Sequence, residues 1–246
     1  MTFDAHPRSS LIVALDFDSL STALKFAEKV ADLVGMFKIG SQLFTTAGPE
    51  AVRQVAKLNA DIFLDLKYHD IPNTVAGAVL AAAALPRVQL LNVHALGGTA
   101  MMQAAAQAVS AGVPMGADRT RLLAVTLLTS MDAKTVREVG VGGPPKTRVL
   151  KLAKLSQKAG VDGVVASVQE AKAIRKACGR EFLIVTPGVR PKTAELKKDD
   201  QARTATPREA IRAGADFIVV GRPILAAADP RAAAQEIVDE IAAAKS

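Results

Sequence analysis

The chain has 246 residues, 50% of them hydrophobic and 22% charged, which suits one large globular domain with a substantial core. The net charge of +7 is compatible with a nucleic-acid partner, but aromatic residues make up only 4%, tryptophan is absent and lysine and arginine form no block. We therefore expect no nucleic-acid binding and interpret the charge as a mildly basic surface that attracts an anionic substrate.

The single cysteine, Cys178, excludes an internal disulfide and a multi-cysteine metal site. Residues 1–10 contain charged side chains and no apolar run, which is not typical of a secretory signal. The longest apolar stretch, residues 75–85, is too short to span a bilayer. We expect a cytoplasmic protein that does not bind a membrane.

Eight short apolar runs alternate with stretches of helical spacing along the chain. The expected strands cover residues 11–16, 36–40, 61–67, 89–95, 121–129, 163–167, 182–187 and 217–222. The expected helices cover residues 19–34, 49–58, 74–85, 99–109, 146–158, 168–177, 207–213 and 230–244. Continuous apolar strands are typical of a parallel sheet covered by helices.

Eight strand–helix units in this length favour an α/β fold of the (β/α)8 TIM barrel type, although an open doubly wound sheet gives a similar pattern. No shift in composition marks a second domain, so residues 1–246 are expected to form one barrel domain. In such a barrel the functional side chains lie at the carboxyl ends of the strands. Polar residues gather at these ends: Asp16, Lys38, Asp65, Lys67, His94, Thr129, Ser167, Arg190, Gly221 and Arg222.

The densest group is the run DLKYHDIPNT at residues 65–74, which follows a buried strand. Because strand side chains alternate, Asp65 and Lys67 are expected on one face and Leu66 and Tyr68 on the other. Asp70 lies just beyond the strand. The simplest alternative is a salt bridge at a strand end with no catalytic role.

Two further segments are candidates for ligand binding. Residues 219–223 (VVGRP) end the last strand, where a glycine permits close backbone approach and an arginine adds donors, so we favour a phosphate site over a solvated turn. Residues 186–203 are polar and aperiodic, which indicates either a loop that closes over a ligand or a surface excursion. Residues 140–147 resemble a P-loop but lack a glycine before Lys146 and contain two prolines, so we expect a loop there.

The histidines give weaker signals. His94 is a possible base but is more often structural at such a position, and His69 either orients Asp65 or Asp70 or only packs. The three histidines and scattered carboxylates form no recognisable metal-binding pattern.

The run at 65–74 resembles the catalytic signature of the orotidine 5′-monophosphate decarboxylase family. Six further segments agree with the same family: ALD at 14–16, FKIG at 37–40, LTS at 128–130, PGVR at 187–190, DDQ at 199–201 and VGR at 220–222. The shorter pattern Asp-x-Lys-x-x-Asp is shared with related sugar-phosphate enzymes, whereas all seven segments together are specific. The resemblance implies decarboxylation of orotidine 5′-monophosphate to uridine 5′-monophosphate, the last step of pyrimidine nucleotide synthesis, without a metal or cofactor.

The resemblance also implies the roles of individual residues. Lys67 is the proton donor, and Asp65 and Lys38 complete its charged network. Asp70 and Thr74 reach the active site of the other subunit of a homodimer. The resemblance places Asp16, Lys38 and Thr74 at the ribose and Thr129 near the pyrimidine. It assigns the phosphate to Gln201, Gly221 and Arg222, with Arg190 close by.

Two other functions remain open at this point. A related metal-dependent sugar-phosphate decarboxylase or aldolase would use the carboxylates as ligands and would lose activity with a chelator. A non-enzymatic barrel that binds phosphate or nucleic acid would bind polyanions with a steep salt dependence and show no turnover.

Overall fold

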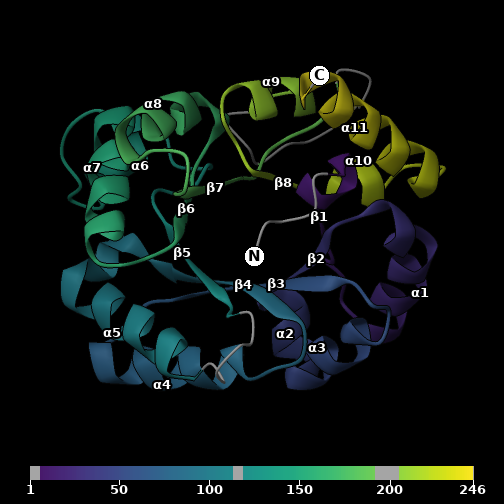
Figure 1. The fold of residues 1–246 in the computed structure, drawn as a ribbon, viewed down its shortest axis with the longest axis horizontal. Helices are drawn as coiled ribbons and strands as arrows, with labels where there is room; N and C mark the ends of the chain where they lie inside the picture. The colour runs from purple at the N-terminus through teal and green to yellow at the C-terminus, as the bar shows by residue number, and fades with distance from the viewer. Residues whose placement is uncertain (1–5, 113–118, 192–204, 246) are drawn as a thin grey trace.

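The computed structural model describes residues 6–112, 119–191 and 205–245. Eight parallel strands form a closed barrel, in which each strand pairs with the next and the last pairs with the first (Figure 1). The strands are β1 (Leu11–Ala14), β2 (Met36–Gly40), β3 (Asp61–Tyr68), β4 (Val88–His94), β5 (Arg121–Val125), β6 (Gly163–Val165), β7 (Leu183–Thr186) and β8 (Phe217–Val220). The expected barrel is therefore confirmed, and the open sheet is excluded because no strand is left at an edge.

Helices surround the strands as an outer ring (Figure 1). The eight helices that follow the strands as expected are α1 (Leu20–Val30), α3 (Pro49–Ala56), α4 (Pro72–Ala83), α5 (Gly98–Ala111), α7 (Pro145–Lys158), α8 (Val168–Cys178), α9 (Pro207–Arg212) and α11 (Pro230–Lys245). Short 3-10 turns lie at η1 (Pro7–Ser10), η2 (Ala31–Leu33) and η3 (Ala95–Gly97). No helix of the described residues is long and apolar enough to cross a membrane.

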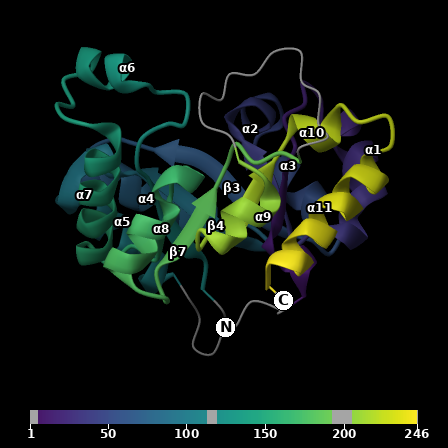
Figure 2. The same cartoon turned by 90° about the horizontal axis from the view of Figure 1, so that it is seen from above.

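Three short helices were not expected from the sequence: α2 (Ser41–Ala47), α6 (Ala133–Glu138) and α10 (Arg222–Leu225). All three follow the carboxyl end of a strand, and Figure 2 shows α6 raised above α7 on one side of the barrel. Segments of four to seven residues contain too few turns to display a helical repeat in the sequence.

The ends of the helices follow from local chemistry. The Ser19 hydroxyl accepts a hydrogen bond from the backbone N–H of Thr22 and so begins α1. Gly214, with φ of +102°, follows the last turn of α9, where the left-handed conformation suits glycine. Helix α4 begins at Pro72, two residues earlier than expected, because proline is favoured in the first turn of a helix.

Strand alternation separates two apolar clusters. Ile12, Phe63, Leu90 and Phe217 belong to a cluster that fills the barrel interior. The alternate residues of the strands, such as Leu11 of β1, pack in a larger cluster with the helices. Both clusters are almost fully buried, so they fix the positions of the strands whose ends carry the polar groups.

Several strands end earlier than expected. β1 ends at Ala14 instead of residue 16, β5 at Val125 instead of 129, and β8 at Val220 instead of 222. The polar residues just beyond these ends leave the ladder and form the rim.

Candidate active site

A cavity of about 440 Å³ lies at the carboxyl ends of the strands. Eight of the residues singled out from the sequence line it: Asp16, Lys38, Asp65, Lys67, Thr129, Arg190, Gly221 and Arg222. They come from six different strands or the turns that follow them, so only barrel closure brings them together.

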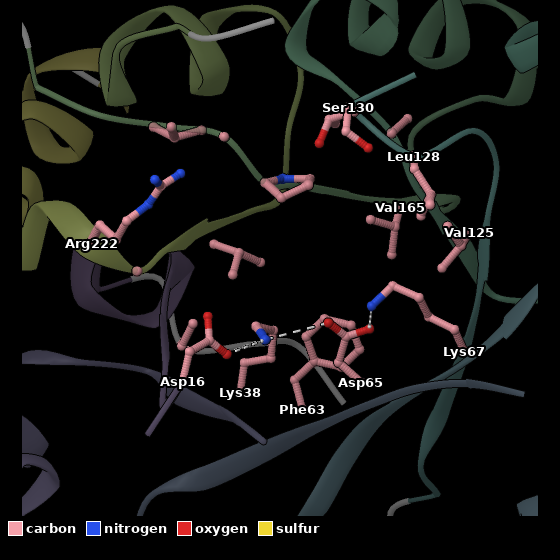
Figure 3. A pocket seen from close by; sticks show the side chains of 18 of the residues that line it. Asp16, Lys38, Phe63, Asp65, Lys67, Val125, Leu128, Ser130, Val165 and Arg222 are labelled. Atoms are coloured by element: carbon pink, nitrogen blue, oxygen red, sulfur yellow. Dashed lines mark hydrogen bonds and ion pairs between the residues drawn. The ribbon is translucent and has the colours of Figure 1, made fainter. Parts of the chain in front are cut away.

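Four of these residues form a row of alternating charge along one wall (Figure 3). Lys38 Nζ lies 3.1 Å from Asp16 Oδ1 and 3.5 Å from Asp65 Oδ2. Lys67 Nζ lies 2.7 Å from Asp65 Oδ1. Asp65 is thus held between two ammonium groups, one on each carboxylate oxygen.

The carboxylate of Asp65 is buried, and burial alone would raise its pKa. The charges of Lys38 and Lys67, with hydrogen bonds from Lys67 and Asn92, outweigh burial and hold the pKa of Asp65 below its usual range. Asp65 therefore stays ionised at neutral pH and fixes the position of both ammonium groups.

Lys67 has an unusual backbone. Its φ is +50°, in the left-handed region that a residue with a Cβ adopts at a cost. The expected alternation nevertheless holds, since Asp65 and Lys67 line the cavity while Leu66 and Tyr68 pack with the outer cluster. The Lys67 side chain remains 37% exposed and faces open space in the cavity.

The two sides of the cavity differ in polarity. Val125, Leu128 and Val165 give one side of the cavity an apolar wall near Lys67 (Figure 3). Arg222 lies across the cavity from Lys67, on the side of Asp16 (Figure 3). A ligand with a flat, weakly polar end and an anionic end would match this arrangement.

Two predicted site residues, Asp70 and Thr74, do not line this cavity. Asp70 and Thr74 are exposed beyond β3, and Asp70 Oδ1 accepts a hydrogen bond from the N–H of Ile71 at 2.6 Å. Gln201 lies outside the described residues.

His69 and His94 pack against each other, with ring centroids 5.4 Å apart. His94 Nδ1 accepts a hydrogen bond from the N–H of Leu96 at 3.3 Å. Burial, followed by the neighbouring His69 and Lys67, lowers the pKa of His94 to about 4, so its imidazole is neutral at pH 7. Neither ring lines the cavity.

Asn92 is the residue that the sequence reasoning passed over. It is fully buried on β4, donates from Nδ2 to Asp65 Oδ1 at 2.6 Å and accepts the Lys67 backbone N–H at 2.8 Å. A buried polar side chain needs partners, but Gln89 and His94 lie in the same strand, so the sequence alone did not single out Asn92.

Within the described ranges, no three His, Cys, Asp or Glu side chains are grouped so that they could hold a metal ion. Both oxygens of Asp65, the most buried carboxylate of the cavity, already face ammonium groups. A cation placed there would meet two like charges.

Comparison with known proteins gives one consistent result. The sequence model described as the "Orotidine 5'-phosphate decarboxylase / HUMPS family" matches residues 9–237. The chain is 56% identical to the orotidine 5'-phosphate decarboxylase of Trichlorobacter lovleyi and 55% identical to that of Pelobacter propionicus, in each case over 96% of both chains. The crystal structure of orotidine 5'-phosphate decarboxylase from Lactobacillus acidophilus superimposes with a TM-score of 0.82 at 40% identity, covering 94% of this chain and 98% of that one.

Proposed function

The chain belongs to the orotidine 5'-phosphate decarboxylase / HUMPS family, and from this premise we propose that it converts orotidine 5′-monophosphate to uridine 5′-monophosphate and carbon dioxide. It is then a carboxy-lyase of pyrimidine nucleotide synthesis, and a cytoplasmic location fits that pathway. The observation that carries the proposal is the Lys38–Asp65–Lys67 row, which places a fixed ammonium beside an apolar wall.

In the proposed reaction the bond between C6 of the pyrimidine and the carboxylate breaks, and its electron pair stays on C6. No electron sink in the ring accepts this pair, so the carbanion must be stabilised from outside. The Lys67 ammonium would stabilise it more than it stabilises the substrate, which lowers the barrier. The same ammonium then donates a proton to C6 and is later reprotonated from solvent.

Asp65 would face the departing carboxylate. Two unit charges ~4 Å apart repel by roughly 4 kcal/mol at an effective dielectric constant near 20. Carbon dioxide is neutral, so this repulsion would disappear as the bond breaks. The two flanking lysines keep Asp65 ionised, which the repulsion requires.

The other end of the substrate would occupy the opposite side of the cavity. We assign Asp16 and Lys38 to the ribose, Thr129 to the pyrimidine, and Arg190, Gly221 and Arg222 to the phosphate. Gln201 is assigned to the phosphate from the family resemblance alone. Phosphate binding far from C6 would provide binding energy for positioning the base.

We further propose that residues 1–246 form one domain and act as a homodimer, with Asp70 and Thr74 entering the partner's cavity. Their exposure supports this, as do exposed apolar side chains nearby: Ile71 is 66% exposed and Leu96 is 40% exposed. A second copy over this surface would cover both groups.

The direct test mixes the protein with orotidine 5′-monophosphate and follows the loss of pyrimidine absorbance, in parallel assays with and without a chelator. Turnover that the chelator leaves unchanged supports the proposal. Turnover that the chelator abolishes would favour a metal-dependent enzyme, and salt-sensitive polyanion binding without turnover would favour a binding protein.

A further inference from the structure

The ladder between β3 and β4 is interrupted beside Lys67. Leu64 pairs with Leu91 and Tyr68 pairs with Val93, so residues 65–67 lie opposite a single residue, Asn92. Such a bulge leaves backbone groups without partners in the ladder and turns a side chain in a new direction.

The side chain of Asn92 replaces part of the missing ladder. Its Oδ1 accepts the Lys67 backbone N–H at 2.8 Å, and its Nδ2 donates to Asp65 Oδ1 at 2.6 Å. The Asn92 side-chain amide cannot be flipped by 180°, because a backbone N–H only donates and a carboxylate only accepts. An asparagine therefore satisfies both partners in one orientation.

These hydrogen bonds reach Asp65 and Lys67 from the side that faces away from the cavity. Asn92 is fully buried and does not line the cavity, so it has no access to a ligand. It joins the Asp65 carboxylate to the left-handed backbone of Lys67, whose Nζ meets the same Asp65 oxygen at 2.7 Å. Backbone, carboxylate and ammonium thus form one closed set of hydrogen bonds.

We propose that Asn92 is a positioning residue for decarboxylation, which holds the bulge of β3 so that Asp65 and the Lys67 ammonium face the same point of the cavity. This inference rests on the role proposed for Lys67. A displacement of about 1 Å in a reacting group lowers turnover by about 10²-fold, which sets the expected size of the effect.

Two variants separate the two hydrogen bonds. Asn92→Ala removes both, and we expect kcat to fall about 10²-fold while binding of uridine 5′-monophosphate changes less than about threefold. Asn92→Asp keeps the acceptor for Lys67 but puts a second carboxylate against Asp65. Two adjacent carboxylates share a proton, so the activity of this variant should rise as pH falls, unlike that of the wild type.

Thr120→Val is the matched control. Thr120 is buried before β5, and its hydroxyl donates to the carbonyl of Val88 at 2.7 Å, away from the cavity. Its loss removes a buried hydrogen bond without touching the charged row, so kcat per folded molecule should stay at the wild-type value.

Three results would overturn the proposal: a kcat for Asn92→Ala within about threefold of wild type, an activity loss that only follows the folded fraction, as in the control, or an unchanged pH profile for Asn92→Asp. If the wild-type protein fails to decarboxylate the nucleotide, the proposed function fails separately, and crystal structures then decide the role of Asn92. If Lys67 of the Asn92→Ala variant keeps its positive φ and its contact with Asp65, the positioning role of Asn92 is contradicted. If both are lost, that role is supported.

Discussion

Replacing Lys67 by alanine removes the group on which the proposed chemistry depends. The Lys67 ammonium approaches a full negative charge on Asp65 at 2.7 Å. At this separation and an effective dielectric constant of about 20, two unit charges attract by about 6 kcal/mol. A carbanion at the same separation would gain a similar amount, whereas the attraction to Asp65 is present in substrate and transition state alike and cancels. A loss of about 6 kcal/mol corresponds to about four powers of ten in kcat.

The variant should remain folded, because Asp65 keeps Lys38 at 3.5 Å and the Asn92 amide at 2.6 Å. Three measurements are needed: kcat from pyrimidine absorbance, the Kd of uridine 5′-monophosphate by calorimetry, and the thermal unfolding midpoint. Lys134→Ala is a suitable control, since it removes an exposed lysine on α6. The reasoning is refuted if Lys67→Ala keeps more than about 1% of the wild-type kcat.

Three further predictions concern the phosphate, the second subunit and pH. Arg222→Ala should lower kcat/KM for the nucleotide by roughly 10- to 100-fold, the worth of a charged hydrogen bond, but leave the slow turnover of the phosphate-free nucleoside unchanged. Lys67→Ala and Asp70→Ala, unfolded and refolded together, should recover about a quarter of the wild-type sites, because half of the dimers are mixed and each of these has one intact site. His94→Asn should reduce the loss of stability on acidification, measured by denaturant unfolding at two pH values. Burial lowers the pKa of His94 from 6.5 to about 4, so between these values the unfolded chain binds a proton that the folded chain does not, and stability falls as pH falls. The shift corresponds to at most about 3 kcal/mol, and partial exposure of the ring reduces this to roughly 1–2 kcal/mol.

Each of these has a contrary outcome. Equal losses on nucleotide and nucleoside would remove Arg222 from the phosphate site. A refolded mixture as inactive as its parents would place Asp70 in the cavity of its own chain. A His94→Asn protein as acid-sensitive as the wild type would show that other groups titrate in this range.

The barrel was predictable because each of its elements carries a local signal. Apolar runs mark the strands, helical spacing marks the long helices, and residues such as Gly214 mark where a helix ends. The short helices α2, α6 and α10 lacked such a signal. The expected strand ends at residues 16, 129 and 222 lie beyond the observed ones, because the rim residues continue the sequence pattern after the ladder has ended.

The charged groups of the site were predictable from their position after the strands, and the structure brings Lys38, Asp65 and Lys67 together as expected. The part played by Asn92 was not predictable, because it depends on three residues of one strand facing one residue of the next. The register describes how two strands pair, so it cannot be predicted from the sequence of either strand alone. The expected place of Asp70 remains a prediction, since it depends on a second chain.

The seam between β1 and β8 has a consequence for how the protein is made. The first strand pairs with the last, so the sheet cannot close on a ribosome until nearly the whole chain has emerged. Asp16 follows one of these strands and Arg222 the other, which places the two sides of the seam on the same cavity. A nascent chain that stops before β8 carries the Lys38–Asp65–Lys67 row but lacks Arg222 on the other side of the cavity. Completion of the binding site and closure of the sheet are therefore the same late step of biosynthesis.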